Sequence, residues 1–326
     1  MTDVTAYADR TVFVTGASGI VGSWLVRSLL SAGAAVVALV RDEDPRSEFV
    51  RSGDDHRAAR VHGSLEDLAL LERLVVQYEV DAVFHLGAQT QVRHAQRQPW
   101  ATLEANVRGT YNLLEAVRRS ARHVQAVVVA SSDKAYGASP ALPYTEEHPL
   151  VGRNIYDASK SAADLLTSAY GNSYGLPLGI ARCANIYGGG DLNWDRIVPG
   201  TIRSLLNGEA PIIRSDGTLQ RDYLHVDDAV AGYLALGAAL MAGRERCEAF
   251  NFGNGQPIAV LEIVEEIGKA IGRTDLVPIV RSDAPNEIPA QWLDSAKAAS
   301  RLGWTPALTL REGLGRTVEW YREALA

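Results

Sequence analysis

Short apolar runs recur along the first half of the chain, separated by stretches in which apolar residues return every three or four positions. β-branched and other apolar residues fill positions 11–15, 35–40, 82–86, 124–130 and 178–182, and helical spacing covers 24–32, 65–76, 103–118 and 156–170. Because these strands are apolar throughout rather than alternating, both of their faces should be buried, as in a parallel sheet covered by helices. With right-handed crossovers, this pattern predicts an α/β fold with a doubly wound parallel sheet of the Rossmann type.

The pattern changes after residue 186. Gly188-Gly189-Gly190 begins a region rich in loops, which contains seven prolines between positions 199 and 306. A length of 326 residues also favours two units over one. We therefore predict a domain of the Rossmann type over 1–186 and a smaller mixed lobe over 187–326 that interleaves with the first.

Composition excludes several classes of protein. Apolar residues make up 47% and charged residues 22%, which rules out a mostly disordered chain. A net charge of −7 gives no overall attraction for nucleic acid or an anionic membrane, and we expect neither as a partner. Two distant cysteines and no ligand-like spacing of His, Asp or Glu predict no disulfide framework and no metal site. The first residues lack a signal-peptide pattern and no apolar run is long enough for a bilayer, so we expect a cytoplasmic protein.

A glycine-rich segment, Thr-Gly-Ala-Ser-Gly-Ile-Val-Gly at 15–22, joins the first predicted strand to the first predicted helix. Glycines at these offsets allow a tight turn and a close approach of the backbone to a pyrophosphate, which the helix N-terminus attracts. The alternative is a structural turn with glycines spaced by chance. Its place between a strand and a helix favours a dinucleotide site formed by Gly16, Ser18, Gly19, Ile20 and Gly22.

The end of the second predicted strand leaves the choice of dinucleotide open. An acidic residue there binds the ribose hydroxyl of NAD, whereas an arginine accepts the extra phosphate of NADP. Arg41 and Asp42 offer both groups at this point, and either could also be solvated surface.

Tyr156 and Lys160 are spaced one helical turn apart on the same face of a predicted helix. A nearby ammonium favours the tyrosinate, so the tyrosine could act as a base near neutral pH. Ser132 and Asp133 follow the fourth predicted strand, at the sheet edge where reacting groups lie in open α/β folds. A Tyr-x-x-x-Lys pair alone also fits an ordinary amphipathic helix, so it is this order of motifs that indicates an enzyme.

With these motifs the chain resembles the extended short-chain dehydrogenase/reductases that act on nucleotide sugars. The likeness covers nearly the whole chain and includes the motifs HLGAQ at 85–89, NVRGT at 106–110, RDYLHVDD at 221–228 and LGWTP at 302–306. Within that superfamily, GSWL at 22–25, SDK at 132–134, GGGD at 188–191 and RIVP at 196–199 look most like CDP-glucose 4,6-dehydratases. Val40-Arg41 looks instead like the NADP-using GDP-mannose 4,6-dehydratases.

The resemblance implies a redox-neutral cycle on a tightly bound, recycled NAD or NADP. Tyr156 would take the proton of the sugar 4-hydroxyl, Ser132 would donate a hydrogen bond to the 4-oxygen, and Asp133 would protonate the departing 6-hydroxyl. Lys134 stands where the better-known dehydratases have a glutamate, and it could be a base only if burial or a neighbouring cation lowered its pKa. Its alternative role is that of a salt-bridged residue facing solvent.

A 4-epimerase of nucleotide sugars is the competing function. It would need Tyr156, Lys160 and Ser132 but no acid at position 133, where superfamily epimerases usually carry small neutral residues. Because charged groups are costly to desolvate, the pair Asp133-Lys134 favours a nucleotide-hexose 4,6-dehydratase that forms a 4-keto-6-deoxy sugar. The intact Ser/Tyr/Lys set argues against a third possibility, a cofactor-binding scaffold without activity.

The resemblance extends the expected sites. It adds Leu65, Leu86, Ala88 and Asn106 to the cofactor residues, and it implies a homodimer through the helices at 103–118 and 156–170. Arg182, Arg203 and Arg281 are expected to be structural, and Asn286-Glu287 would complete the phosphate pocket. The expected substrate residues are Gln89, Asn185, Arg196, Val198, Ile212, Arg214 and Arg221.

Overall fold

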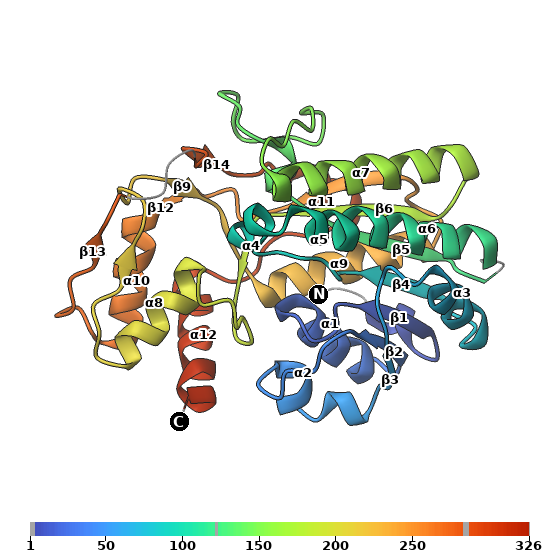
Figure 1. Ribbon diagram of the computed structural model, residues 1–326, viewed down its shortest axis with the longest axis horizontal. Helices are drawn as coiled ribbons and strands as arrows, with labels where there is room; N and C mark the ends of the chain where they lie inside the picture. The colour runs from blue at the N-terminus through green and yellow to red at the C-terminus, as the bar shows by residue number, and fades with distance from the viewer. Residues whose placement is uncertain (1–3, 121–122, 283–286, 326) are drawn as a thin grey trace.

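The computed structural model describes residues 4–120, 123–282 and 287–325. Its centre is a parallel sheet of seven strands in the order β11-β6-β5-β4-β1-β2-β3, with helices on both faces (Figure 1). The predicted doubly wound α/β fold is confirmed. Five strands match predicted runs: β1 (Thr11–Thr15), β2 (Ala35–Val40), β4 (Ala82–His85), β5 (Ala126–Ser132) and β6 (Leu178–Cys183).

The sequence pattern does not predict two strands of this sheet. β3 (Ala59–His62) is an edge strand whose side chains are mostly exposed, so it lacks the apolar run that marks a buried strand. β11 (Glu248–Phe252) lies far along the chain, where the proline-rich loops predict a separate lobe. The strand predicted as the fourth is therefore the fifth in chain order.

Alternate residues of each central strand enter opposite cores, which explains their continuous apolar sequence. In β1, Val12 and Val14 pack in one core, whereas Phe13 packs in the other. The first core lies under α1 (Ile20–Ser31), α2 (Glu48–Arg51) and α9 (Val226–Met241). The second lies under α3 (Leu68–Gln77) and α6 (Gly109–Ser120), with α7 (Ile155–Tyr174) packed beside α6.

The helix predicted over 103–118 is not a single regular α-helix. α5 (Pro99–Leu103) and α6 are joined by a π-helical turn, η3, over Glu104–Arg108. Such turns carry an extra residue and often mark functional positions. Here the turn directs Asn106 inward, where its amide bonds both backbone groups of Gln89, at 2.7 and 3.0 Å, and the hydroxyl of Ser159 at 2.9 Å.

The second lobe is built on three helices, α8 (Ile197–Leu206), α10 (Val260–Ile271) and α12 (Leu310–Leu325), which share a third apolar core. It lies at the left of Figure 1, beside the large sheet. Its small sheets contain β7 (Asn185–Tyr187), β8 (Ile212–Ile213), β9 (Gln220–Arg221), β10 (Tyr223–His225), β12 (Ile258–Ala259), β13 (Ile279–Val280) and β14 (Ala290–Gln291). The remaining elements are α4 (Val92–Arg97), α11 (Ala296–Leu302) and the 3-10 turns η1 (Val4–Tyr7), η2 (Asp54–His56) and η4 (Asp133–Tyr136).

The chain crosses between the two lobes more than once. α9 and β11 come from the second half of the sequence, yet α9 packs on the large sheet and β11 pairs with β6 at its edge. The boundary at residue 186 stays a prediction, but sequence position alone does not assign a segment to a lobe.

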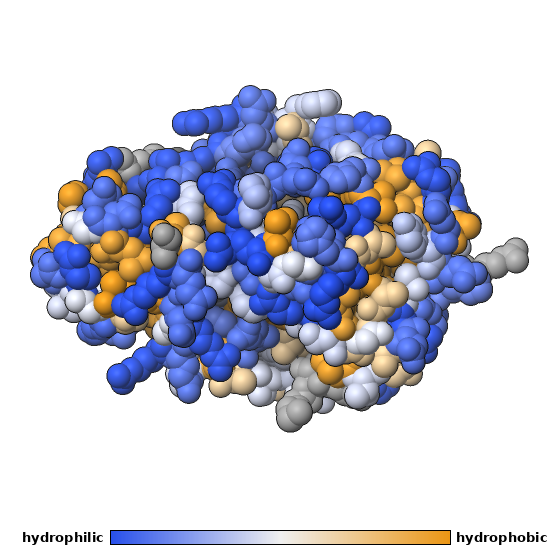
Figure 2. Space-filling model, turned by 90° about the horizontal axis from the view of Figure 1, so that it is seen from below, coloured by the Kyte–Doolittle hydropathy of each residue, from blue (hydrophilic) through white to orange (hydrophobic). Residues whose placement is uncertain are grey.

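The face of the molecule that Figure 2 draws is mainly polar. Figure 2 shows hydrophilic side chains over most of one face, with separate apolar groups toward both ends. None of the helices in the described ranges is both long enough and apolar enough to cross a bilayer.

A buried ion pair ties β6 to α7. Arg182 donates to both carboxylate oxygens of Asp164, at 2.8 and 2.9 Å, and also to the hydroxyl of Tyr136 and the carbonyl of Glu146. The side chains of Arg182 and Asp164 are only 7% and 1% exposed. Arg182 is therefore structural, as the sequence analysis expects.

Removing one partner of this pair should be strongly destabilising, because the other charge would remain buried without compensation. We expect Asp164→Asn to lower the free energy of unfolding by about 3–5 kcal/mol, measured by urea denaturation. The matched change Asp275→Asn breaks the exposed pair with Arg273 and should cost no more than about 1 kcal/mol. Equal losses in the two variants would contradict this role.

Candidate active site

A cleft of about 1930 Å³ separates the carboxyl edge of the large sheet from the second lobe. Pockets for a single small ligand are typically about 300–1,000 Å³, so this cleft has room for two ligands side by side. The strand order reverses between β4 and β1, and ligands of doubly wound sheets bind at such a point.

The glycine loop between β1 and α1 lines one end of this cleft. A Cβ at Gly22 would lie 2.0 Å from the carbonyl oxygen of Gly16, and one at Gly16 would lie 2.7 Å from the nitrogen of Gly87. Gly19 caps α1 without a side-chain hydrogen bond, so the N–H groups of the first turn remain available. A tight backbone cradle at an uncapped helix N-terminus fits the diphosphate of a dinucleotide.

Arg41 and Asp42 line the same end, just beyond β2. Their side chains form an ion pair of 2.6 Å and are 65% and 75% exposed. Both charged groups are thus paired with each other yet exposed to a ligand, and the geometry leaves the choice between NAD and NADP open.

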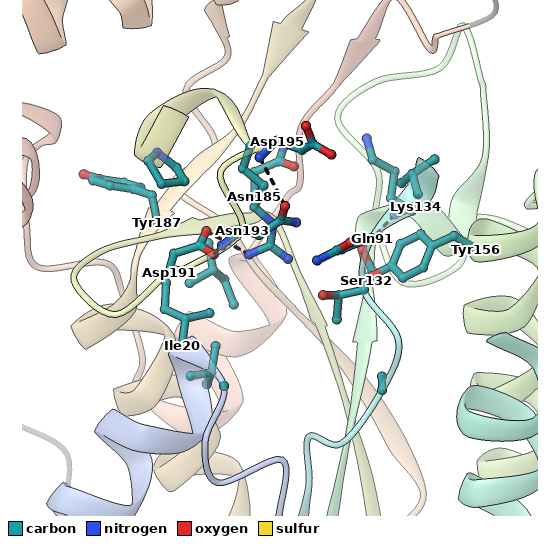
Figure 3. A pocket seen from close by; sticks show the side chains of 18 of the residues that line it. Ile20, Gln91, Ser132, Lys134, Tyr156, Asn185, Tyr187, Asp191, Asn193 and Asp195 are labelled. Carbon is teal, nitrogen blue, oxygen red and sulfur yellow. Dashed lines mark hydrogen bonds and ion pairs between the residues drawn. The ribbon is translucent and has the colours of Figure 1, made fainter. Parts of the chain in front are cut away.

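Ser132, Tyr156 and Lys160 meet in the middle of the cleft. Figure 3 shows Ser132, Lys134 and Tyr156 on one side of the pocket, at the ends of β5 and α7. Lys160 donates to the carbonyl of Ala130 at 2.9 Å, and burial lowers the pKa of its ammonium to about 8. Burial raises the pKa of Tyr156 to about 12, against the opposing effects of the Arg196 charge and a hydrogen bond with Ser132.

Three further ionisable groups lie beside this set, two buried carboxyls and the half-buried Lys134. Asp133 is 1% exposed and accepts from the Ser132 hydroxyl at 3.0 Å, while its Oδ2 has no hydrogen-bond partner. Asp157 is 2% exposed, and its Oδ1 also lacks a partner. Burial raises the pKa of Asp157 to about 6, an effect that the Lys134 charge opposes and the Asp133 charge reinforces. Burial lowers the pKa of Lys134.

The opposite wall belongs to the second lobe. Asn185 and Asp195, labelled in Figure 3, face the pocket from this side. Three arginines predicted to bind the substrate line the wall, and each is already paired with a carboxylate: Arg196 with Asp191 at 3.1 Å, Arg214 with Asp195 at 2.7 Å and Arg221 with Glu287 at 3.1 Å. An anionic ligand must therefore compete with these carboxylates or share the arginines with them.

Most of the predicted site residues come together around the cleft, whereas Asp133, Asn106 and Gln89 do not line it. Asp133 and Asn106 lie buried behind its wall. Arg203 and Arg281, expected to be structural, do line it, and Asn286 lies outside the described residues. The predicted lining residues are Gly16, Ser18, Gly19, Ile20, Gly22, Arg41, Asp42, Leu65, Leu86, Ala88, Ser132, Lys134, Tyr156, Lys160, Asn185, Arg196, Val198, Ile212, Arg214 and Arg221.

The described ranges contain no cluster of three or more His, Cys, Asp or Glu side chains arranged to hold a metal ion. Two residues at the site have no counterpart in the sequence prediction. Asp157 directly follows Tyr156, but an acidic residue in the first turn of a helix is common for helix stability alone. Gln291 is distant in sequence, and only the tertiary fold brings it to Lys134.

A sequence model of the family described as GDP-mannose 4,6 dehydratase matches residues 13–317. The chain belongs to the NAD-dependent epimerase/dehydratase family of extended short-chain dehydrogenase/reductases. It is therefore an enzyme of the NAD-dependent nucleotide-sugar dehydratase/epimerase family.

Relatives of this epimerase/dehydratase family member carry names from both halves of the family. The chain is 33% identical to a CDP-glucose 4,6-dehydratase of Salmonella typhimurium, over 99% of this chain and 93% of the relative. It is also 33% identical to a UDP-glucose 4-epimerase of Mycolicibacterium smegmatis, over 95% and 97% of the two chains. Among solved structures, the dTDP-glucose 4,6-dehydratase DesIV of Streptomyces venezuelae with NAD bound superposes with a TM-score of 0.86 at 30% identity, covering 96% and 97% of the chains.

The buried carboxyl of Asp157 should make stability depend on pH. Its pKa rises from the ordinary 3.8 to about 6, so between these values the folded state binds a proton that the unfolded state has lost. Stability therefore falls as the pH rises through this window, and the cost is fully present above it. We expect Asp157→Asn to raise the free energy of unfolding by up to about 3 kcal/mol near neutral pH, and by nothing below about pH 4.

Denaturation by urea across this pH range measures the effect. Asp216→Asn is the matched control, because the hydroxyl and N–H of Thr218 lower the pKa of that exposed carboxyl. Its replacement should destabilise the protein slightly near neutral pH, which is the opposite sign. A stabilisation of Asp157→Asn that did not vary with pH would rule out the ionised carboxylate as the cause.

Proposed function

We propose that this enzyme is a nucleotide-hexose 4,6-dehydratase that forms a 4-keto-6-deoxy sugar. The observation that carries the proposal is the group of two buried carboxyls, Asp133 and Asp157, and the half-buried Lys134 beside Tyr156. Elimination of water needs an acid and a base in addition to the Tyr/Lys pair, whereas epimerisation at carbon 4 does not. Desolvated charges are costly, so their presence favours the reaction that uses them.

The first step removes a hydride from carbon 4 of the sugar and a proton from the 4-hydroxyl. A bound nicotinamide would supply the acceptor of one hydride and later its donor. Tyr156 takes the proton of the 4-hydroxyl, assisted by the positive charges of Lys160 and Arg196, and Ser132 donates a hydrogen bond to the 4-oxygen. The resulting ketone makes the hydrogen on carbon 5 acidic.

The second step expels water across carbons 5 and 6. Lys134 removes the proton from carbon 5, because burial lowers the pKa of its ammonium and so makes the neutral amine more accessible. Asp157 lines the cleft, and burial raises its pKa to about 6, so its carboxyl can hold a proton near neutral pH and gives it to the departing 6-hydroxyl. When the hydride returns to carbon 6, Lys134 returns its proton to carbon 5, and the proton held by Tyr156 restores the acid.

We propose NAD as the cofactor. NAD is bound in the DesIV structure, which is similar to this chain over nearly its whole length. Asp42 stands at the end of β2, where a carboxylate suits the ribose hydroxyls and repels an added phosphate, and Arg41 is tied to Asp42 by their ion pair.

We also propose a homodimer, with the helices around α6 and α7 at the interface. Large apolar side chains on this side are exposed, with Trp100 at 74%, Leu103 at 41% and Leu165 at 57%. A second copy would cover them. Light scattering in solution measures the mass directly, and a monomer at micromolar concentration would contradict the proposal.

The product decides between dehydratase and epimerase. With CDP-, dTDP-, GDP- and UDP-hexoses as a panel, we expect mass spectrometry to find a product that has lost one water. An isomer of unchanged mass as the sole product would overturn the dehydratase and establish the epimerase. The nucleotide released on denaturing the purified protein should be NAD, and NADP would refute the assignment of the cofactor.

Tyr156→Phe should lower kcat by roughly 10²–10⁴-fold, because the phenyl ring cannot accept the proton of the 4-hydroxyl. Tyr174→Phe is the matched control on the same helix, where the tyrosine is 56% exposed and does not line the cleft. It should retain full turnover. Comparable activity of the two variants would remove Tyr156 from the mechanism.

A further inference from the structure

Lys134 is held by a fully buried side chain from a distant part of the chain. Its ammonium donates a hydrogen bond to Oε1 of Gln291, which is 0% exposed and lies on β14 of the second lobe. The Nε2 of the same amide lies 3.5 Å from the main-chain carbonyl of Asp133. One side chain thus contacts both of the adjacent residues that the proposed elimination uses.

These partners allow only one orientation of the Gln291 amide. An ammonium has no lone pair and can only donate, so the amide must present its oxygen to Lys134. A carbonyl can only accept, so the amide must present its nitrogen to Asp133. The flipped amide would satisfy neither neighbour, and the orientation therefore follows from chemistry.

The backbone of Gln291 is fixed on both sides. β14 pairs with β9, which places Gln291 in register with Arg221, and the N–H of Asp222 donates to the Gln291 carbonyl at 3.2 Å. The next residue, Trp292, accepts a hydrogen bond at 2.9 Å from the N–H of Tyr144, in the loop that follows η4. The strand that carries the amide is thus bound both to the arginine wall and to the segment of Lys134.

The Gln291 side chain is uncharged, and this matters as much as its position. Among the described residues, Asp133, Asp157 and Glu287 favour the charged form of Lys134, while burial and Arg221 disfavour it. A neutral amide accepts the hydrogen bond without adding a fourth negative charge. A carboxylate at the same place would form a buried ion pair and hold Lys134 as ammonium.

The geometry points to Gln291 as a positioning residue that fixes the Lys134 amino group at the edge of the cleft while leaving it free to exchange its proton. The catalytic use of Lys134 rests on the proposed dehydratase, but the control of its proton by Gln291 is a property of the free protein. The two are therefore tested separately.

Direct titration of Lys134 tests the control of its proton. The chain has only four lysines, at positions 134, 160, 269 and 297, so protein labelled with ε-¹³C lysine gives a simple spectrum in which Lys134→Met assigns the Lys134 signal. In Gln291→Glu we expect the titration of Lys134 to move to higher pH by about 1–3 pH units. In Gln291→Met, which keeps the volume but removes the acceptor, it should move lower.

Gln220→Glu is the matched control. It makes the same change of charge on the neighbouring strand β9, but its side chain is exposed, so the Lys134 titration should stay in place. A Lys134 signal that titrates identically in the wild type and in both Gln291 variants would overturn the proposal. If Gln291→Glu does not fold, the shift in Gln291→Met decides on its own.

Measurements of kcat and KM test whether Gln291 acts through Lys134. Gln291→Met should lower kcat by up to roughly 10²-fold with little change in KM, because the base is no longer held in place. In a Lys134→Met background the same change should have no further effect on kcat. Additive losses would show a general structural role for Gln291 and contradict the inference. Failure of dehydration in the wild type would refute the proposed function and leave the titration result standing.

Discussion

Charged side chains lose far more than apolar ones when they leave water, so a fold that buries several together needs a reason to do so. This chain buries Asp133, Asp157 and Lys160 at one edge of its sheet, with Lys134 half-buried beside them. Burial moves the pKa values of the carboxyl of Asp157 and the ammonium of Lys160 in opposite directions, to about 6 and about 8. Burial thereby brings the pKa values of both groups close to neutrality, where each can exchange protons.

Burial leaves single atoms of this group without hydrogen-bond partners. One carboxylate oxygen each of Asp133 and Asp157 lacks a hydrogen-bond partner in the interior. Both carboxylate oxygens of the buried Asp164 are satisfied by Arg182, whereas the buried Asp55, outside the cleft, also keeps one oxygen without a partner.

The second lobe does more than close the cleft. Asp222 accepts backbone hydrogen bonds from Asn254, Gly255 and Leu293, and burial raises the pKa of its carboxyl to about 6. These bonds hold together the strands that carry Arg221 and Gln291. Arg221 in the cleft wall and Gln291, which contacts Lys134, thus belong to one hydrogen-bonded unit. A ligand that displaced Arg221 would therefore also displace Gln291.

Much of this arrangement follows from the sequence, because the signals are local. The glycine loop, the buried apolar strands and the Tyr/Lys spacing each depend on a few neighbouring residues. β3 could not be predicted, since an exposed edge strand of Ala, Arg, Val and His has no apolar run. The π-turn at Asn106 and the contact of Gln291 with Lys134 depend on tertiary packing, which no local pattern encodes. The carboxylate partners of the three cleft arginines were missed for the same reason.

The position of β11 has a consequence for how the protein is made. β6 has β11 as its outer neighbour, but β11 spans Glu248–Phe252, some way behind β6 in the order of synthesis. Until that segment leaves the ribosome, the backbone N–H and C=O groups along the outer side of β6 have no partner strand. An apolar strand with an open edge is a template for pairing between nascent chains. The crossing of the chain between its two lobes therefore makes the middle of translation the interval in which this protein is most exposed to aggregation.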